Sequence, residues 1–490
     1  MRAALRFAAA GLIALATGTA LAAPDQPVTI DAGLVAGTVD DGIAAWRSIP
    51  YAAPPVGPLR WREPQPVAPW SGVRQATSFS PTCMQASVWD KQPRSEDCLT
   101  LSVWAPADYH DRKLPVMVWI HGGGLHSGSG SQPLYLGDQL PRRGVILVTL
   151  NYRLGVFGFF SHPDLTAESP FHASGNQGLL DQVAALHWVR RNIAAFGGDP
   201  ARVTIFGESA GSASVRALMT SPLTDGLFQA AIGESGADAR RVRPDQMPRA
   251  AEENGRQLAE SVGAPSLAAL RALPAETLSA KPWRPEIIVD GHAEAEGSAE
   301  SYDAHHQRDI PLLLGWNADE GVDLAGEPAS AQGRSATDLE IRTAQNAMGS
   351  AMWNWAREQA ADARSPAYVY YFLHVPPEPT IPCTYGCRAG HGAEIRYVFG
   401  HLDQDDRPWR PEDRKVAEQI LSYWTNFAKT GTPNGAGLPE WQRFDGLAAT
   451  VHRLGTEAEI AERGTFPDYT ALLAKWAGSQ HPQSASHQKN

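Results

Sequence analysis

The sequence has no cluster of basic residues. Its 490 residues include 42 Lys and Arg against 53 Asp and Glu, and the resulting net charge of −11 is spread along the chain. Nucleic acids and anionic membrane surfaces are bound by clustered Lys and Arg side chains. The sequence therefore predicts no nucleic-acid partner and no binding to an anionic membrane surface.

Long apolar runs are also missing beyond the N-terminus. A membrane-spanning helix needs about 20 strongly apolar residues, and no later segment qualifies, so no integral membrane contact is predicted. The N-terminus has Arg2 and Arg6, a small apolar segment over 7–21, and Ala20-Leu21-Ala22. This is the pattern of a secretory signal peptide. We expect residues 1–22 to be removed and the protein to be exported, either periplasmic or secreted.

Cysteine is scarce, with four residues that allow three pairings. Cys83 and Cys98 enclose a polar loop, and Cys383 and Cys387 lie close together in the sequence, so pairing by proximity is the simplest expectation. A zinc site is the alternative, but neither pair has the usual Cys-x₂-Cys spacing. No metal and no organic cofactor is predicted.

The remaining composition, 43% hydrophobic and 19% charged, is typical of a globular protein with a sizeable core. Short apolar runs alternate with helical patterns, which indicates an α/β fold with a mostly parallel central sheet. We expect one domain over 23–476, a helical cap inserted at about 240–308 and 325–365, and a disordered tail over 477–490. The expected strands are 28–30, 34–38, 45–51, 99–104, 115–120, 145–150, 203–206, 228–232, 311–315 and 367–373, and the expected helices are 177–196, 209–219 and 416–427.

One short stretch dominates the functional interpretation. The apolar run Val203–Phe206 ends in Gly207-Glu208-Ser209-Ala210-Gly211 and is followed by a helix-competent segment. A strand, Gly-x-Ser-x-Gly and a helix form the pattern of a nucleophile elbow, although the five residues alone also occur by chance. We predict that Ser209 is a catalytic nucleophile raised above the sheet.

A glycine-rich loop follows the expected strand 115–120. His121-Gly122-Gly123-Gly124 would expose consecutive backbone N–H groups with no side chain in the way. Such groups can stabilise the oxyanion that forms when a serine attacks a carbonyl carbon. We predict that this loop contributes to an oxyanion hole.

A serine nucleophile also needs a base and an acid that orients the base. The expected strand 311–315 leads into Asp319 and Glu320, and from chemistry alone the two carboxylates are nearly even as the acid. In the hydrolase order of serine, acid and histidine, the histidines that follow include His374, His391 and His401. We favour His391, because it lies between glycines on a loop after the expected strand 367–373.

The chain resembles a type-B carboxylesterase, the cholinesterase-like branch of the α/β-hydrolase fold. The resemblance runs from about residue 49 to residue 444. The matching stretches are Ser95-Glu96-Asp97-Cys98-Leu99, His121-Gly122-Gly123-Gly124, Asn151-Tyr152-Arg153-Leu154-Gly155, Gly175 to Gln182, Phe196 to Pro200, Phe206 to Gly211, Gly315 to Gly321, and His391 to Gly400.

The resemblance implies several residue roles. The family's acid directly precedes a glycine, which implies Glu320 rather than Asp319. The oxyanion donors would be the N–H groups of Gly123, Gly124 and Ala210. The resemblance also implies the disulfide Cys83–Cys98, and Glu394 matches a buried family glutamate, with a helix-surface charge as the alternative.

The sequence departs from the family in three places. The Cys83–Cys98 loop is short, and Trp89 is the residue considered there as a substitute for the aromatic residue that binds choline in cholinesterases. The segment from Glu320 to His391 is also short, which implies a trimmed cap. The Cys383/Cys387 pair matches no family feature.

We therefore expect a serine carboxylic-ester hydrolase that forms an acyl-enzyme and acts on a small or aromatic ester. Hydrolysis of an amide or a lactone by the same triad is one alternative, because the triad serves both reactions. A catalytically silent cholinesterase-like binding protein is the other, although such proteins typically lack a triad residue. No feature of the sequence indicates the oligomeric state.

Overall fold

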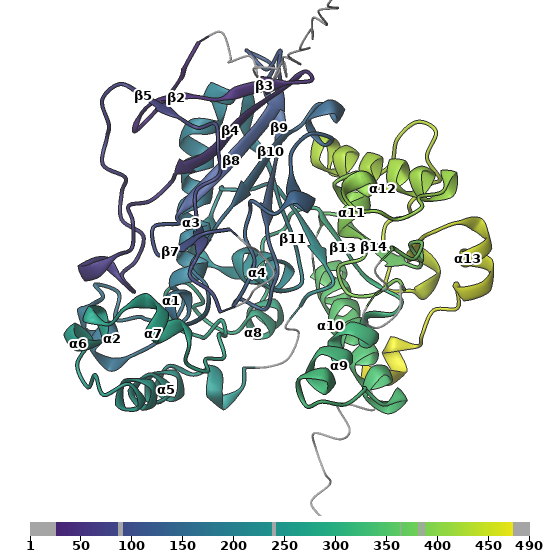
Figure 1. Ribbon diagram of the computed structural model, residues 1–490. Coiled ribbons are helices and arrows are strands. Elements are labelled where there is room, and N and C mark those ends of the chain that lie inside the picture. Colours follow the sequence, from purple (N-terminus) through teal and green to yellow (C-terminus); the bar gives the residue numbers. More distant parts are fainter. Residues whose placement is uncertain are drawn as a thin grey trace, which may run out of the picture.

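The computed structural model describes residues 26–86, 92–237, 242–362, 364–380, 383 and 388–473. The expected signal peptide, Trp89, Cys387 and the expected tail lie outside these residues. Figure 1 shows the described chain as a twisted central sheet with helices on both sides. None of the helices in the described ranges has the length and apolar character that crossing a membrane requires.

The main sheet has ten strands within the described residues, in the order β15-β14-β13-β12-β11-β9-β10-β8-β4-β3. Neighbours from β15 to β10 run parallel, whereas β8, β4 and β3 continue the sheet antiparallel at one edge. The strands are β3 (Thr38–Asp40), β4 (Ile43–Pro50), β8 (Thr100–Pro106), β9 (Leu114–Ile120), β10 (Ile146–Leu150), β11 (Gly198–Glu208), β12 (Ala230–Glu234), β13 (Leu312–Asn317), β14 (Ala367–Phe372) and β15 (His452–Leu454).

The interior strands are apolar because both of their faces are covered. Every residue of β9 and β10 is buried, which confirms the expected strands at 115–120 and 145–150. Side chains of a strand alternate between the two faces. Val116 and Val118 of β9 therefore belong to one core cluster, and Met117 and Trp119 belong to another on the opposite side.

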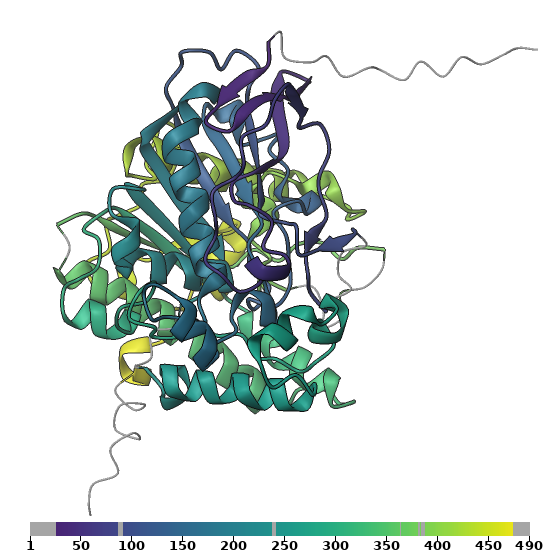
Figure 2. The ribbon, with the colours of Figure 1, turned by 90° about the vertical axis from the view of Figure 1, so that its left-hand side faces the viewer.

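Helices cover each face of the sheet. On the first face, α3 (Gln177–Asn192), α4 (Ala210–Thr220) and α10 (Asp338–Asp362) pack into the core through residues such as Leu186, Val215 and Trp355. On the second face, α11 (Ile395–Val398) and α12 (Pro411–Thr430) contribute Tyr397 and Trp424. Figure 2 shows the layers from the side. The helices expected over 177–196, 209–219 and 416–427 are confirmed.

A third, smaller cluster of buried side chains belongs to helices that lie below the sheet in the view of Figure 1. It joins α1 (Gly155–Gly158) and α2 (Pro163–Glu168) to three helices of the segment 240–308, namely α5 (Pro248–Ser261), α6 (Leu267–Ala272) and α7 (Ala275–Ser279). The same segment includes α8 (Ser298–Asp303), but residues 281–297 between α7 and α8 form no helix. Two prolines, Pro282 and Pro285, lie in this stretch, and proline disrupts a helix interior.

The described part of the chain also forms two small sheets, β1-β2-β5 and β6-β7. Their strands are β1 (Val28–Ile30), β2 (Gly33–Ala36), β5 (Val73–Gln75), β6 (Thr82–Cys83) and β7 (Arg94–Ser95). The helices α9 (Glu320–Ala331) and α13 (Glu457–Arg463) complete the fold, together with short 3₁₀ turns.

A disulfide joins Cys83 to Cys98, which confirms that expected pairing. Both sulfurs are buried, and the bond closes a loop with a sequence separation of 15. We expect Cys83→Ser to lower the free energy of unfolding by about 3 kcal/mol, because the open loop gains entropy in the unfolded chain. Denaturant unfolding of the oxidised proteins measures the loss, and Cys83→Ser/Cys98→Ser should lose about the same. Equal stability of the variant and the wild type would contradict this account.

Candidate active site

The nucleophile elbow lies where β11 ends and α4 begins. Ser209 stands between Glu208 and Ala210 with φ 56° and ψ −121°, a conformation that costs free energy and that surrounding structure must hold. A Cβ at Gly207 would lie 2.6 Å from the carbonyl oxygen of Ile120, and one at Gly211 would lie 2.0 Å from the same atom. The two glycines of the motif are therefore required by the close approach of β9.

His391 connects Ser209 to an acid. It lies on the loop after β14, and its Nε2 is 2.8 Å from Ser209 Oγ while its Nδ1 is 2.6 Å from Glu320 Oε2. The backbone N–H of His391 donates to Asp323 Oδ2 at 2.8 Å, which fixes the loop. Three residues that are far apart in the sequence thus form one continuous series of hydrogen bonds.

From residue chemistry alone, Asp319 and Glu320 were nearly equally suitable as the acid, and the structure distinguishes them. Glu320 is fully buried as the first residue of α9, and its Oε1 accepts the N–H of Asn317 at 2.9 Å. Asp319 turns away and binds Arg463 at 2.6 Å and the N–H of Ala389 at 3.1 Å. Of the two carboxylates, only that of Glu320 reaches the histidine, whereas Asp319 anchors the loop that carries His391.

The other histidines considered lie elsewhere. His374 is completely buried between Asp413 and Glu459, at 2.7 and 2.8 Å. His401 contacts the carbonyl oxygen of Leu134 at 2.8 Å. Both histidines therefore have structural partners away from Ser209.

The glycine-rich loop runs alongside the serine. A Cβ at Gly122 would lie 3.0 Å from the Cβ of Ser209. Gly123 and Gly124 have φ values of 97° and 62°, and a Cβ at Gly123 would lie 2.3 Å from the carbonyl oxygen of Ser127. Ala210 begins α4, so its N–H belongs to the positive end of a helix. All three expected donors thus lie in segments next to Ser209.

Further buried carboxylates surround the histidine. Glu208 Oε1 lies 3.3 Å from His391 Nε2. Burial raises the pKa of Glu208 to about 7, although the charge of His391 opposes this rise. Burial and the charges of Glu208 and Glu320 likewise raise the pKa of Glu394 to about 8. Glu394 is buried and accepts hydrogen bonds from Ser235 and Asn317, so it is not a helix-surface charge.

The same carboxylates control the histidine. Burial lowers the pKa of His391, but the charges of Glu208 and Glu320 outweigh this effect and raise it to about 10. No function was predicted from the sequence for Glu208 or Glu234. The one feature of the sequence that could have pointed to them is that each is the last residue of a parallel strand. Among the described residues, no group of three or more His, Cys, Asp or Glu is arranged to hold a metal ion.

These charges predict how the pH profile responds to a substitution. Glu208→Gln removes a negative charge that raises the pKa of His391, so the pKa falls and the neutral imidazole persists to lower pH. We expect the acid limb of the kcat/KM profile to move to lower pH by about one unit. Initial rates on a neutral ester from about pH 6 to about pH 11, a range that includes the pKa of about 10, measure this shift. A shift to higher pH would contradict the electrostatic account.

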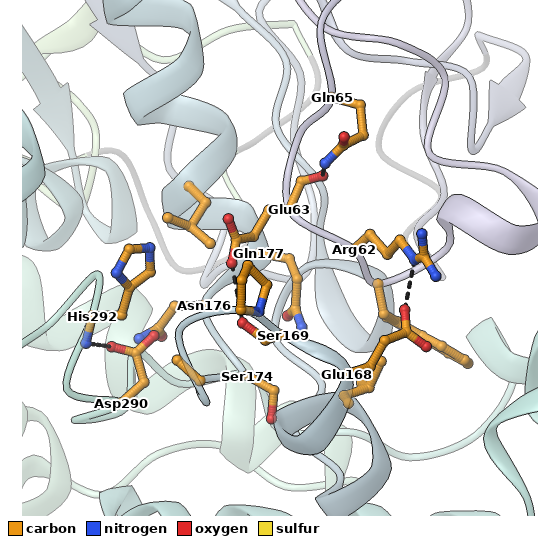
Figure 3. Close-up of a pocket in the computed structure, with 15 residues that line it drawn as sticks. Arg62, Glu63, Gln65, Glu168, Ser169, Ser174, Asn176, Gln177, Asp290 and His292 are labelled. Carbon is orange, nitrogen blue, oxygen red and sulfur yellow. Dashed lines mark hydrogen bonds and ion pairs between the residues drawn. The ribbon is translucent and has the colours of Figure 1, made fainter.

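The hollow drawn in Figure 3 is a separate feature. It has a volume of about 290 Å³ and lies between residues of the segments 61–65, 165–180 and 290–292. Arg62 and Glu168 form an ion pair on one side of it, at 2.6 Å. The described residues that line it include none of those gathered around Ser209.

Comparisons with known proteins agree with this geometry. The carboxylesterase family profile matches residues 24–347 and 342–470. The fumonisin B1 esterase of Sphingopyxis macrogoltabida is 35% identical over 454 residues, which cover 83% of this chain and 82% of that protein. The para-nitrobenzyl esterase of Bacillus subtilis (strain 168) is 37% identical over 474 residues, which cover 84% and 91%.

Solved structures give the same result. A thermophilic PNB esterase superposes with a TM-score of 0.76 at 34% identity and covers 88% of this chain and 96% of that one. Another PNB esterase structure gives 0.74 at 35% identity and covers 86% and 93%. The expected α/β-hydrolase fold is confirmed. The chain therefore belongs to the type-B carboxylesterase family and is a carboxylic-ester hydrolase.

Proposed function

We propose that the protein hydrolyses small or aromatic carboxylic esters through an acyl-enzyme on Ser209, with His391 as the general base and Glu320 as the acid that orients it. The observation that supports this most directly is the series of hydrogen bonds from Ser209 Oγ through the imidazole to Glu320 Oε2, at 2.8 and 2.6 Å. The strained backbone of Ser209, held by close-packed glycines, further supports its role as the nucleophile.

The first half of the reaction forms the acyl-enzyme. Ser209 Oγ attacks the ester carbonyl carbon while His391 Nε2 takes the hydroxyl proton. The negative charge on the former carbonyl oxygen is stabilised by the N–H groups of Gly123, Gly124 and Ala210. The tetrahedral intermediate then collapses, and the alcohol leaves with the proton from the imidazolium.

The second half releases the acid. Water attacks the acyl carbon and gives its proton to His391, and the second tetrahedral intermediate expels Ser209 Oγ, which regains a proton from the imidazolium. Glu320 keeps a proton on Nδ1, so that Nε2 is the free basic nitrogen, and it stabilises the imidazolium in both steps.

The test is to assay the purified protein on p-nitrophenyl esters with acyl chains of increasing length. The p-nitroanilides of the same acids are assayed under the same conditions. We expect turnover of the esters, and the best chain length measures the acyl pocket. An organophosphate should label Ser209, which peptide mass spectrometry detects. Turnover of the anilides alone would favour an amidase. A folded protein without hydrolysis or labelling would favour a binding protein.

The names of the relatives suggest a range of substrates. One similar protein is named for fumonisin B1 and another for a para-nitrobenzyl ester. Both belong in the first substrate panel, because pocket shape decides between a bulky and a small aromatic ester.

We further propose that the protein is exported, to the periplasm or outside the cell, after cleavage behind Ala22. The sequence pattern of residues 1–22 supports this proposal, and so does the Cys83–Cys98 disulfide, because such bonds persist in oxidising compartments. N-terminal sequencing of the protein from fractionated cells should begin at Ala23. An intact N-terminus in the cytoplasmic fraction would contradict export.

A further inference from the structure

A buried arginine lies on the helix that begins behind the nucleophile. Arg216 follows Ser209 by seven residues, which places its Cα about 10 Å further along α4. Its side chain is 1% exposed, and its Nη2 donates to Glu358 Oε2 at 2.8 Å. Its Nε and Nη1 have no hydrogen-bond acceptor among the described residues. A charged donor group left partly unpaired in the interior is costly, so its surroundings are informative.

Two aromatic rings pack against the guanidinium. Its central carbon lies 4.4 Å from the ring centre of Tyr302 and 5.5 Å from that of Trp355. Tyr302 belongs to α8, which lies beside α4 (Figure 1), and Trp355 Nε1 donates to its hydroxyl at 2.7 Å. Guanidinium groups stay charged in proteins, and Glu358 pairs with only one nitrogen of this one, so Nε and Nη1 remain as charged donors without an acceptor in the described part of the chain.

Arg216 lines a cavity of about 240 Å³ whose lining includes residues close in the chain to the glycine-rich loop and to Ser209. Leu125, which directly follows the glycine-rich loop, lines the same cavity. So does Ala213, whose N–H donates to the carbonyl oxygen of Ser209 at 3.0 Å. A substrate whose carbonyl carbon meets Ser209 Oγ can therefore extend a substituent toward the guanidinium.

The other charged groups that line the cavity, among the described residues, accept no hydrogen bond from Nε or Nη1 of Arg216. Arg243 and Arg284 also line it, and both form ion pairs with Glu286, at 2.5 and 3.1 Å. Burial raises the pKa of the remaining lining acid, Glu294, to about 8. At neutral pH this carboxyl is therefore mostly protonated and can donate a hydrogen bond. The two guanidinium nitrogens without an acceptor within the described ranges are therefore the groups of this cavity that an anion could satisfy.

We infer that the cavity beside α4 binds a carboxylate carried by the ester substrate, and that Arg216 is its cationic hydrogen-bond donor. The inference rests on the proposed ester hydrolysis at Ser209 and names the class of ester: one with a free carboxylate in addition to the ester bond. That carboxylate belongs either to the acid part, as in the half-ester of a dicarboxylic acid, or to the alcohol part.

Matched substrates test the inference on the wild-type protein. The first pair is the p-nitrophenyl half-ester of adipic acid and p-nitrophenyl hexanoate, whose acyl chains have equal length. The second pair is 4-acetoxybenzoate and its methyl ester, which place the carboxylate on the alcohol. In one of the two pairs, kcat/KM for the charged ester should exceed that for the neutral ester by about tenfold or more, as expected for a charge-assisted hydrogen bond. The favoured pair identifies the source of the carboxylate.

Two variants connect the preference to the residue. Arg216→Met keeps the length of the side chain and removes the charge, and it should reduce the charged-to-neutral ratio by about tenfold, mainly through KM. Arg216→Lys keeps the charge and should retain part of the ratio. Lys281→Gln is the matched control, because Lys281 lines a different cavity, of about 450 Å³, which shares no described lining residue with the cavity at Arg216. This control should keep the wild-type ratio.

The outcomes are distinct. If kcat/KM of the wild type is the same for the neutral and the charged ester in both pairs, the proposed carboxylate site is wrong while the esterase proposal stands. If the ratio falls in Lys281→Gln and not in Arg216→Met, the assignment to Arg216 is overturned. If no ester of any kind is hydrolysed, the esterase proposal itself fails. Should Arg216→Met not fold, the wild-type ratios and Arg216→Lys still decide the question.

Discussion

Replacing Ser209 by alanine should lower kcat on a p-nitrophenyl ester by about 10⁶-fold, because removal of a serine nucleophile eliminates the acyl-enzyme route and leaves only binding and the oxyanion donors. The alanine keeps the Cβ of Ser209, which already fits beside Gly122, and the substitution removes only the hydroxyl. We therefore expect an unchanged melting temperature. Stopped assays with long incubation are needed to measure so small a residual rate.

A variant of the base and the corresponding double variant show whether Ser209 and His391 act in the same step. His391→Ala should lose about as much activity as Ser209→Ala, and the double variant should lose no more, because residues that act as one unit are strongly non-additive. Independent losses that multiply in the double variant would contradict a shared step. A Ser209→Ala protein with more than about one hundredth of the wild-type rate would place the nucleophile elsewhere.

The parts of the site that could be predicted from the sequence are those in which a local backbone constraint and a chemical role coincide. Gly207 and Gly211 show this, since the close approach of Ile120 leaves no space for a side chain on either residue. His391 was predicted from its order in the chain and its place after a strand, and the structure brings it to Ser209. The interior strands followed from continuous apolar runs, because both of their faces are buried.

Other features depend on packing between distant segments. The strand β15 has only three residues, His452–Leu454, and its parallel pairing with β14 is not visible in so short a pattern. The carboxylates around His391 gather from the ends of different strands, so their mutual effect on pKa cannot be read from the order of residues. The cavity at Arg216 is lined in part by the non-helical segment 281–297, which lies within the helical cap expected at about 240–308.

The choice between Asp319 and Glu320 shows the same limit, and it leads to the second large effect. Glu320→Gln should lower kcat by about 10⁴-fold with little change in stability. The carboxylate Oε2 now accepts the proton on His391 Nδ1 at 2.6 Å. A glutamine amide that donates to Nδ1 would place the ring proton on Nε2. Nε2 could then not accept the proton of Ser209. Single-turnover rates of acylation, followed by p-nitrophenol release, measure the loss.

Asp319→Asn is the matched control, because it makes the same chemical change one residue earlier. Asp319 binds Arg463 and the N–H of Ala389 and does not contact the imidazole. We expect kcat to change by less than about tenfold and the free energy of unfolding to fall by about 1 kcal/mol, as the partly exposed ion pair weakens. The reverse ranking, with the larger loss of kcat in Asp319→Asn, would show that the carboxylate of Asp319 is the one that orients the base. The two variants together thus test by measurement the choice of Glu320, which the family resemblance implied and which the chemistry of two adjacent acids left open.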